Sequence, residues 1–210
     1  MRNFWKESKK PFIALAPMAD VTDCVFRKLI AENSSPLDTL DYTRVFWTEF
    51  VSADGLAHPE ARPKLLVDLR YDEIERPIVA QIFGGKPENI RQAAELCAKL
   101  GFDGVDINMG CPADDIVKQC AGSALIKDPK LAREIIRAAI EGAGGLPVSV
   151  KTRIGYHKEE LETWLPEILA ENISALTVHL RTRKEMSLVP AHWELMGKIL
   201  EIRDKVNKEV

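Results

Sequence analysis

Long apolar runs are missing from this 210-residue sequence, although 46% of its residues are hydrophobic. No stretch approaches the roughly 18 apolar residues that a membrane-spanning helix needs. The charged N-terminus is not followed by the apolar stretch of a signal peptide. These absences predict a cytoplasmic protein with no membrane partner, and the length is sufficient to bury a large core.

An excess of positive charge is also missing, since the formal net charge is −3. Nucleic-acid binders usually carry a basic surface, because neutralising phosphates supplies most of their affinity. Any contact with RNA must therefore come from a local patch, or from a part of the protein outside these residues.

Motifs for metals and dinucleotides are absent as well. The four cysteines, Cys24, Cys97, Cys111 and Cys120, show no C-x-x-C or metal-ligand spacing. We therefore expect free thiols and no metal. No G-x-G-x-x-G follows the first apolar segment, which disfavours a dinucleotide-binding Rossmann fold.

What the sequence does contain is a regular alternation of strand-like and helix-like segments. Strands are predicted at residues 12–16, 45–48, 77–82, 105–107, 147–151 and 175–179. Helices are predicted from Thr22 or Asp23 to residue 30, and at 87–100, 128–141, 159–171 (kinked or restarted at Pro166) and 191–206. Helical spacing places Cys97 and Leu100 on a buried face. Strands separated by amphipathic helices indicate βαβ units and a parallel sheet.

Special residues stand where each predicted strand stops. In a βα barrel the carboxyl ends of all strands meet on one face, where active sites are built. Taken singly, Glu49 could be a solvated acid, Gln81 a satisfied amide and His179 a structural histidine. Their joint placement predicts a site. The strand ends are, in order, Pro17-Met18-Ala19, Glu49, Gln81, Asn108, Lys151 and His179.

The end of the fourth strand carries the most specific pattern, Asn108-Met109-Gly110-Cys111-Pro112 followed by Ala121-Gly122-Ser123-Ala124-Leu125. A lone cysteine beside a glycine is more often a small buried residue than a catalyst. The whole string, however, resembles the active-site segment of the tRNA-dihydrouridine synthases. Further matches follow in the order of that family, at residues 16–23, 26–27, 48–50, 81–85, 150–153 and 178–183. Asp20 stands where the family commonly has glycine.

The resemblance implies an α/β fold of the (β/α)8 TIM-barrel type and reduction of tRNA uridine to 5,6-dihydrouridine. It implies FMN as cofactor, NADPH or NADH as reductant, and tRNA as partner. Cys111 would be the catalytic acid, while Cys120 is given no role. The expected cofactor-binding residues are Pro17, Met18, Ala19, Gln81, Lys151 and His179. The expected substrate-binding residues are Asn108, which would pair with the uracil edge, and Arg181 and Arg183, which would contact phosphate unless they are only an exposed basic loop.

A complete barrel needs eight strands and typically about 250 residues. Because six strands are predicted, we expect residues 1–210 to form a flavin-binding catalytic barrel truncated after about six βα units. Strands seven and eight and a C-terminal helical tRNA-binding domain would be absent, and FMN would bind weakly or not at all. Two alternatives stay open: an FMN-dependent barrel acting on a free small molecule, and a non-catalytic fragment. The modified uridine and the choice of nicotinamide are not predicted.

Overall fold

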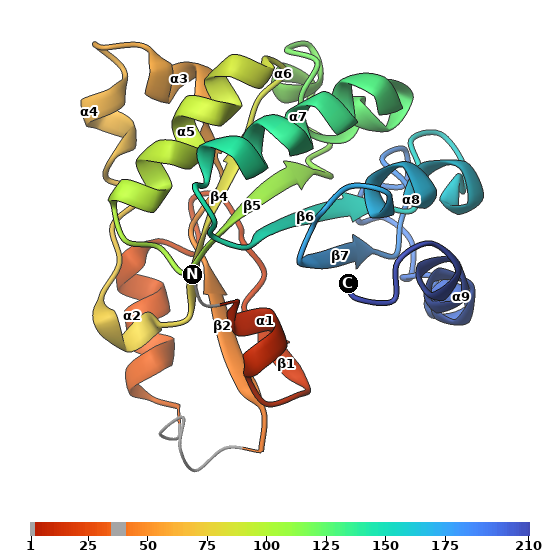
Figure 1. Ribbon diagram of the computed structural model, residues 1–210, viewed down its shortest axis with the longest axis horizontal. Coiled ribbons are helices and arrows are strands. Elements are labelled where there is room, and N and C mark those ends of the chain that lie inside the picture. The colour runs from red at the N-terminus through yellow and green to blue at the C-terminus, as the bar shows by residue number, and fades with distance from the viewer. Residues whose placement is uncertain (1–2, 35–40) are drawn as a thin grey trace.

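The computed structural model, which describes residues 3–34 and 41–210, shows a curled sheet of parallel strands flanked by helices (Figure 1). Six strands lie side by side in chain order, and a short strand, β3 (Val51–Ser52), pairs with β4. All six predicted strands are confirmed, and the order is that of a βα barrel. They are β1 (Phe12–Ala14), β2 (Thr43–Trp47), β4 (Ile78–Phe83), β5 (Gly104–Met109), β6 (Val148–Arg153) and β7 (Ala175–His179).

Two of the longer helices begin directly after residues whose side chains cap them. The Asp23 side chain accepts a hydrogen bond from the Phe26 amide at 2.7 Å, and Asp128 accepts one from Leu131 at 3.1 Å. Such side chains satisfy amides that have no partner inside the helix. The longer helices are α2 (Cys24–Glu32), α5 (Pro87–Lys99), α7 (Pro129–Gly142), α8 (Leu161–Leu169) and α9 (Met196–Val206).

Helix α8 continues through Pro166, so of the two predicted alternatives the restart is wrong. Two other details of the helix prediction are wrong. Helix α9 begins at Met196 rather than at residue 191, because the 3₁₀ turn Trp193–Leu195 comes first. Leu100 follows the last residue of α5, so it leaves the buried face and is 39% exposed.

Several short elements were not predicted. They are α1 (Phe4–Glu7), α3 (Ala53–Ala57), α4 (Arg62–Leu65), α6 (Asp114–Val117), and the 3₁₀ turns Glu73–Glu75 and Gly122–Lys127. Part of the polar loop expected between residues 33 and 42 lies outside the described residues.

The main core lies between the outer face of the sheet and the helices. Ile82, Ile107 and Val150 point outward from the strands and pack with residues such as Ile135 of α7. Cys97 is fully buried in this layer, as predicted, and burial raises the pKa of its thiol to about 12. All four cysteines are free thiols. No helix in the described residues is long and apolar enough to cross a membrane.

A second, smaller core fills the inner face of the sheet near the amino ends of the strands. Trp47 and Val79 point inward there, and the short helix α1 adds Phe4 and Trp5. The Trp5 and Trp47 rings lie 5.7 Å apart. Because this apolar layer closes one end of the inner face, the polar inward-facing residues gather at the carboxyl ends.

Candidate active site

The register of the strands brings most of the expected site residues onto one face. Gln81 on β4 lies beside Asp106 on β5, which lies beside Ser149 on β6. Residues in register on parallel strands share a face, as do residues two apart on one strand. The next two rows of the same face contain Asn108 beside Lys151, and Arg153 beside His179.

Hydrogen bonds connect the first two rows into a buried chain that ends at the backbone of Cys111. The Gln81 Nε2 donates to Asp106 Oδ2 at 2.7 Å. The Asn108 Nδ2 donates to Gln81 Oε1 at 3.1 Å. The amides of Gly110 and Cys111 both donate to Asn108 Oδ1, at 3.1 and 2.9 Å. Asn108 therefore has one N–H left, so it can donate one hydrogen bond to a ligand rather than form the expected pair.

Asp106 and Ser149, at the other end of this chain, were not assigned to the site from the sequence. The Ser149 hydroxyl donates to Asp106 Oδ1 at 2.5 Å. Burial raises the pKa of Asp106, against the hydrogen bonds from Ser149 and Gln81. A signal was present in the sequence, because Asp106 is two residues before Asn108 in an otherwise apolar strand and so shares its face.

Lys151 is half-buried at the centre of the site. Burial lowers the pKa of its ammonium, while the charge of Asp106 raises it. In the described part of the chain, this ammonium forms no hydrogen bond or ion pair. A buried cation without a partner is costly, so the position suits an anionic or strongly hydrogen-bonding ligand.

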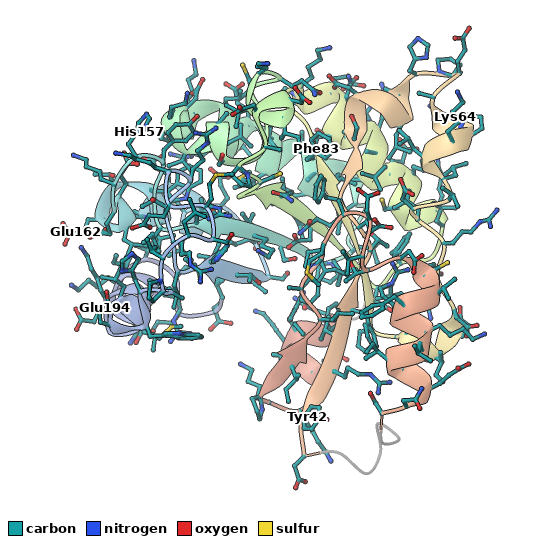
Figure 2. All side chains as sticks on the ribbon, turned by 180° about the vertical axis from the view of Figure 1, so that it is seen from behind. Tyr42, Lys64, Phe83, His157, Glu162 and Glu194 are labelled. Atoms are coloured by element: carbon teal, nitrogen blue, oxygen red, sulfur yellow. The ribbon has the colours of Figure 1, made fainter. Side chains whose placement is uncertain are left out.

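Cys111 lies half-buried against a small apolar cluster of Phe83, Ile116 and Ala121 (Phe83 is labelled in Figure 2). Its carbonyl accepts a hydrogen bond from the Ser123 amide at 3.0 Å. Gly122 has a φ of +59°, and a Cβ there would lie 2.9 Å from the Cys111 carbonyl oxygen. Only glycine fits that position easily. The segment at residues 121–125 therefore needs its glycine in order to pack against Cys111, which gives a physical reason why the two halves of the motif, 108–112 and 121–125, occur together. Cys120 is exposed nearby.

Arg153 was noted in the sequence only as part of a matching segment, yet it holds the Cys111 loop. Its Nε donates to the Gly110 carbonyl at 2.7 Å. Its Nη1 donates to the carbonyls of Thr182 and Met186, at 3.1 and 2.9 Å. This buried guanidinium therefore joins the end of β5 to the loop that follows β7.

The two arginines expected to contact phosphate already have partners within the chain. Arg181 donates to the Val189 carbonyl at 2.7 Å, and its Nη1 lies 3.0 Å from His179 Nε2. Arg183 forms an ion pair with Asp114 of α6 at 2.5 Å. These two arginines therefore do not form a free basic loop. Arg181 lies beside His179, and Arg183 lies beside α6, which follows Cys111.

His179 is held as a neutral acceptor. Burial, with the positive charges of Arg153 and Lys151 adding to it, lowers the pKa of His179 to about 4. Because the guanidinium of Arg181 can only donate, His179 Nε2 must accept and its proton lies on Nδ1. A donated bond from His179 to a ligand would therefore come from Nδ1.

The segment after β1 joins the site through the end of β2. Pro17 is half-buried, while Met18 and Ala19 are exposed. Asp20 has a φ of +58° and its amide donates to Glu49 at 2.5 Å. The left-handed backbone at Asp20 is the conformation that glycine adopts most easily. Burial raises the pKa of Glu49, and the charges of Asp68 and Asp20 add to this.

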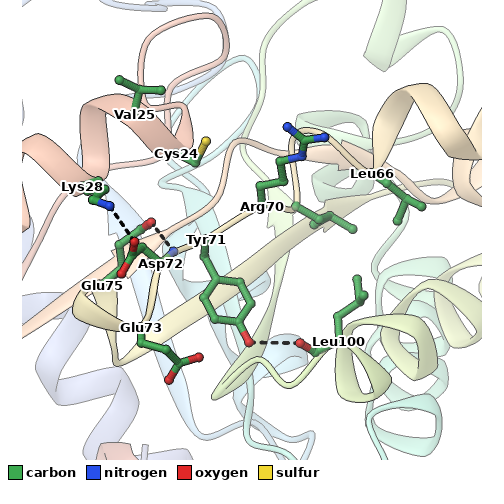
Figure 3. A pocket seen from close by; sticks show the side chains of 11 residues that line it. Cys24, Val25, Lys28, Leu66, Arg70, Tyr71, Asp72, Glu73, Glu75 and Leu100 are labelled. Atoms are coloured by element: carbon green, nitrogen blue, oxygen red, sulfur yellow. Dashed lines mark hydrogen bonds and ion pairs between the residues drawn. The ribbon is translucent and has the colours of Figure 1, made fainter.

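Other features of the molecule lie away from these residues. A pocket of about 860 Å³ opens on the outer surface between α2, the 3₁₀ turn Glu73–Glu75 and the end of α5, where Lys28 bonds to Asp72 and Tyr71 to Leu100 (Figure 3). It shares no residue with the inner face. Within residues 3–34 and 41–210, no group of three or more His, Cys, Asp or Glu residues could hold a metal ion.

Known proteins are similar to this chain over most of its length. Residues 14–210 match the family model described as dihydrouridine synthase. The chain is 47% identical over 205 residues to the "Probable tRNA-dihydrouridine synthase" of Staphylococcus aureus (strain COL). It is 49% identical over 205 residues to the "Probable tRNA-dihydrouridine synthase 2" of Bacillus subtilis (strain 168). Each alignment covers 97% of this chain, which spans 60% of the length of either relative.

Proposed function

Because the chain belongs to the dihydrouridine synthase family, we propose that it reduces uridine in tRNA to 5,6-dihydrouridine, with FMN as cofactor and NADPH or NADH as reductant. The substrate is suggested by the names of the relatives. The observation that carries the proposal is the position of Cys111, whose backbone is held by Asn108 and whose thiol lies near the charges of Lys151 and Arg153.

The residues present suit a flavin. Lys151 has an ammonium without a partner in the described chain, Gln81 retains one N–H, and Met18 and Ala19 offer an open surface. Together with Pro17 and His179 they would hold the cofactor. A bound FMN would supply the reducing equivalents, which the nicotinamide replenishes.

Cys111 would protonate a carbon of the uracil double bond from its Sγ. An ordinary thiol is mostly protonated near neutral pH yet gives up its proton readily, which suits a general acid. Lys151 and Arg153, both of which interact electrostatically with Cys111, would be the charged groups nearest to the sulfur during the transfer.

Asn108 and the two arginines would orient the RNA. The remaining N–H of Asn108 can donate to a carbonyl of the base. The target uridine must leave the base stack, at a cost of a few kcal/mol. Arg183 could reach a phosphate by exchanging Asp114, which is itself exposed, for the nucleic acid.

The test is dihydrouridine mapping of tRNA from cells that lack the gene. We expect at least one uridine to lose its modification, and we expect the wild-type gene and Cys120→Ala to restore it. Cys111→Ala should lower single-turnover tRNA reduction by at least about 100-fold, the usual effect of losing a general acid. An unchanged dihydrouridine map would overturn the proposal.

A further inference from the structure

One buried carboxyl group, Asp106, terminates the hydrogen-bond chain that leads to Cys111, and the mechanism above does not use it. We propose that Asp106 is a positioning residue. Through Gln81 and Asn108 it holds the backbone amides of Gly110 and Cys111 in place, and so fixes the position of the Cys111 thiol. The role of Cys111 as acid rests on the proposed function, whereas the positioning itself does not.

The groups at the two ends of this chain, the backbone amides and the Asp106 carboxyl group, determine which atom donates and which accepts in every hydrogen bond between them. The amides of Gly110 and Cys111 can only donate, so Asn108 must turn Oδ1 toward them and Nδ2 toward Gln81. Gln81 must then turn Oε1 toward Asn108 and Nε2 toward Asp106. The chain therefore needs an acceptor at its far end, and Asp106 Oδ2 supplies it.

Because Asp106 has a second oxygen, Oδ2 can accept from Gln81 whether the carboxyl group is ionised or protonated. Oδ1 lies 2.5 Å from the Ser149 hydroxyl, which can donate to a carboxylate or accept from a carboxylic acid. In either protonation state Oδ2 remains free to accept from Gln81. Asp106, Gln81 and Ser149 are 0%, 0% and 1% exposed, so water cannot replace a lost partner.

Two substitutions of similar size separate hydrogen bonding from simple packing. Asp106→Asn can present its carbonyl oxygen to Gln81 and donate its NH₂ to Ser149, so the chain survives. Asp106→Leu fills the space but leaves Gln81 Nε2 without an acceptor in a buried site. The control is Thr177→Val, an exposed position on β7 beside Lys151, which lies on the same inner face and outside the hydrogen-bond chain.

The measurement is the rate at which iodoacetamide alkylates Cys111, read by peptide mass spectrometry with Cys24 on α2 as internal reference. It requires neither flavin nor tRNA, so a failure here is distinct from failure of the proposed function. We expect Asp106→Leu to change the Cys111 rate by about threefold or more, as local opening raises access. Asp106→Asn and Thr177→Val should keep the wild-type rate.

A coupling experiment covers the case in which Asp106→Leu does not fold. In Asp106→Asn, Ser149 becomes the acceptor for the new NH₂, so adding Ser149→Ala should change the Cys111 rate by more than the two single changes combined. A wild-type Cys111 rate in folded Asp106→Leu would overturn the proposal. So would an Asp106→Asn rate equal to that of Asp106→Leu, or additive effects in the double variant.

Discussion

The ion pair between Arg27 and Glu75 permits a sharp test of how the start of the chain is held. Both side chains are 0% exposed, and Arg27 Nε donates to Glu75 Oε2 at 2.6 Å. The guanidinium also donates to the carbonyls of Thr22 at 2.7 Å and Arg70 at 2.6 Å. Arg27 therefore ties α2, and the loop that carries Met18 to Asp20, to the 3₁₀ turn containing Glu75.

Removing one partner leaves the other charge buried without compensation. We expect Glu75→Gln or Arg27→Met to lower the free energy of unfolding by about 3–5 kcal/mol. Gln keeps an oxygen for the Asp72 amide, which donates to Glu75 Oε1 at 2.8 Å, but its NH₂ then faces the Arg27 Nε–H. The loss in Glu75→Gln therefore includes the hydrogen bond to Arg27 as well as the charge. The double variant removes both charges and should cost about 2–3 kcal/mol less than the sum of the single changes.

The assay is urea unfolding followed by circular dichroism. With a slope of about 2 kcal/mol per molar urea, each single change should move the midpoint by roughly 1.5–2.5 M. The matched control is Lys28→Gln on the same helix. Lys28 forms an ion pair with Asp72, and the two side chains are 47% and 41% exposed. This control should leave the urea midpoint close to that of the wild type, because an exposed ion pair contributes little to stability. Strict additivity in the double variant would refute the reasoning.

Three further predictions concern the site and its supports. Gly122→Ala, which forces a Cβ against the Cys111 carbonyl and Ile116 at a φ of +59°, should cost about 1–3 kcal/mol in urea unfolding; a loss below 0.5 kcal/mol, the size of an ordinary surface change, would show that the loop yields easily. Trp164→Phe removes the buried hydrogen bond from Nε1 to Thr152 Oγ1 at 2.9 Å, while the Thr152 hydroxyl keeps the bond that it donates to the Met109 carbonyl at 3.2 Å. The change should cost about 1–3 kcal/mol in the same assay, and an unchanged urea midpoint would contradict this. His179, with its pKa lowered from 6.5 to about 4, binds fewer protons folded than unfolded, so stability should fall as pH drops from about 6.5 to about 4; proton NMR titration of the ring would contradict this if it gave a midpoint near 6.5.

The architecture was predictable because it depends on local patterns. Apolar runs predicted the six main strands, and residues such as Asp23 and Asp128 predicted where helices begin. Strand β3 and helix α3 were missed because two and five residues are too few to show a period. They are stabilised by packing against β4, α4 and α5, and by the Ser52 side chain, which accepts a hydrogen bond from the Gly55 amide at 3.1 Å.

That the candidate site residues share one face of the sheet was predictable from the sequence, but their interactions were less so. Strand ends identified Gln81, Asn108, Lys151 and His179, since parallel strands place their carboxyl ends together. The pairing of Arg183 with Asp114 joins residues 69 positions apart, and no local pattern encodes such a contact. The expectation that Arg183 forms a free phosphate contact therefore needs the added step of releasing Asp114.

The position of Cys111 shows why the contacts around the site could not be predicted from the sequence. Its neighbour Gly110 is held by Arg153 of β6 through the carbonyl and by Asn108 through the amide. Its own carbonyl is held by Ser123. Each contact is a hydrogen bond between a fixed donor and a fixed acceptor, so a shift in any one segment misaligns the others. The position of Cys111 thus depends on β5, β6 and the 3₁₀ turn Gly122–Lys127, which meet only in the folded chain.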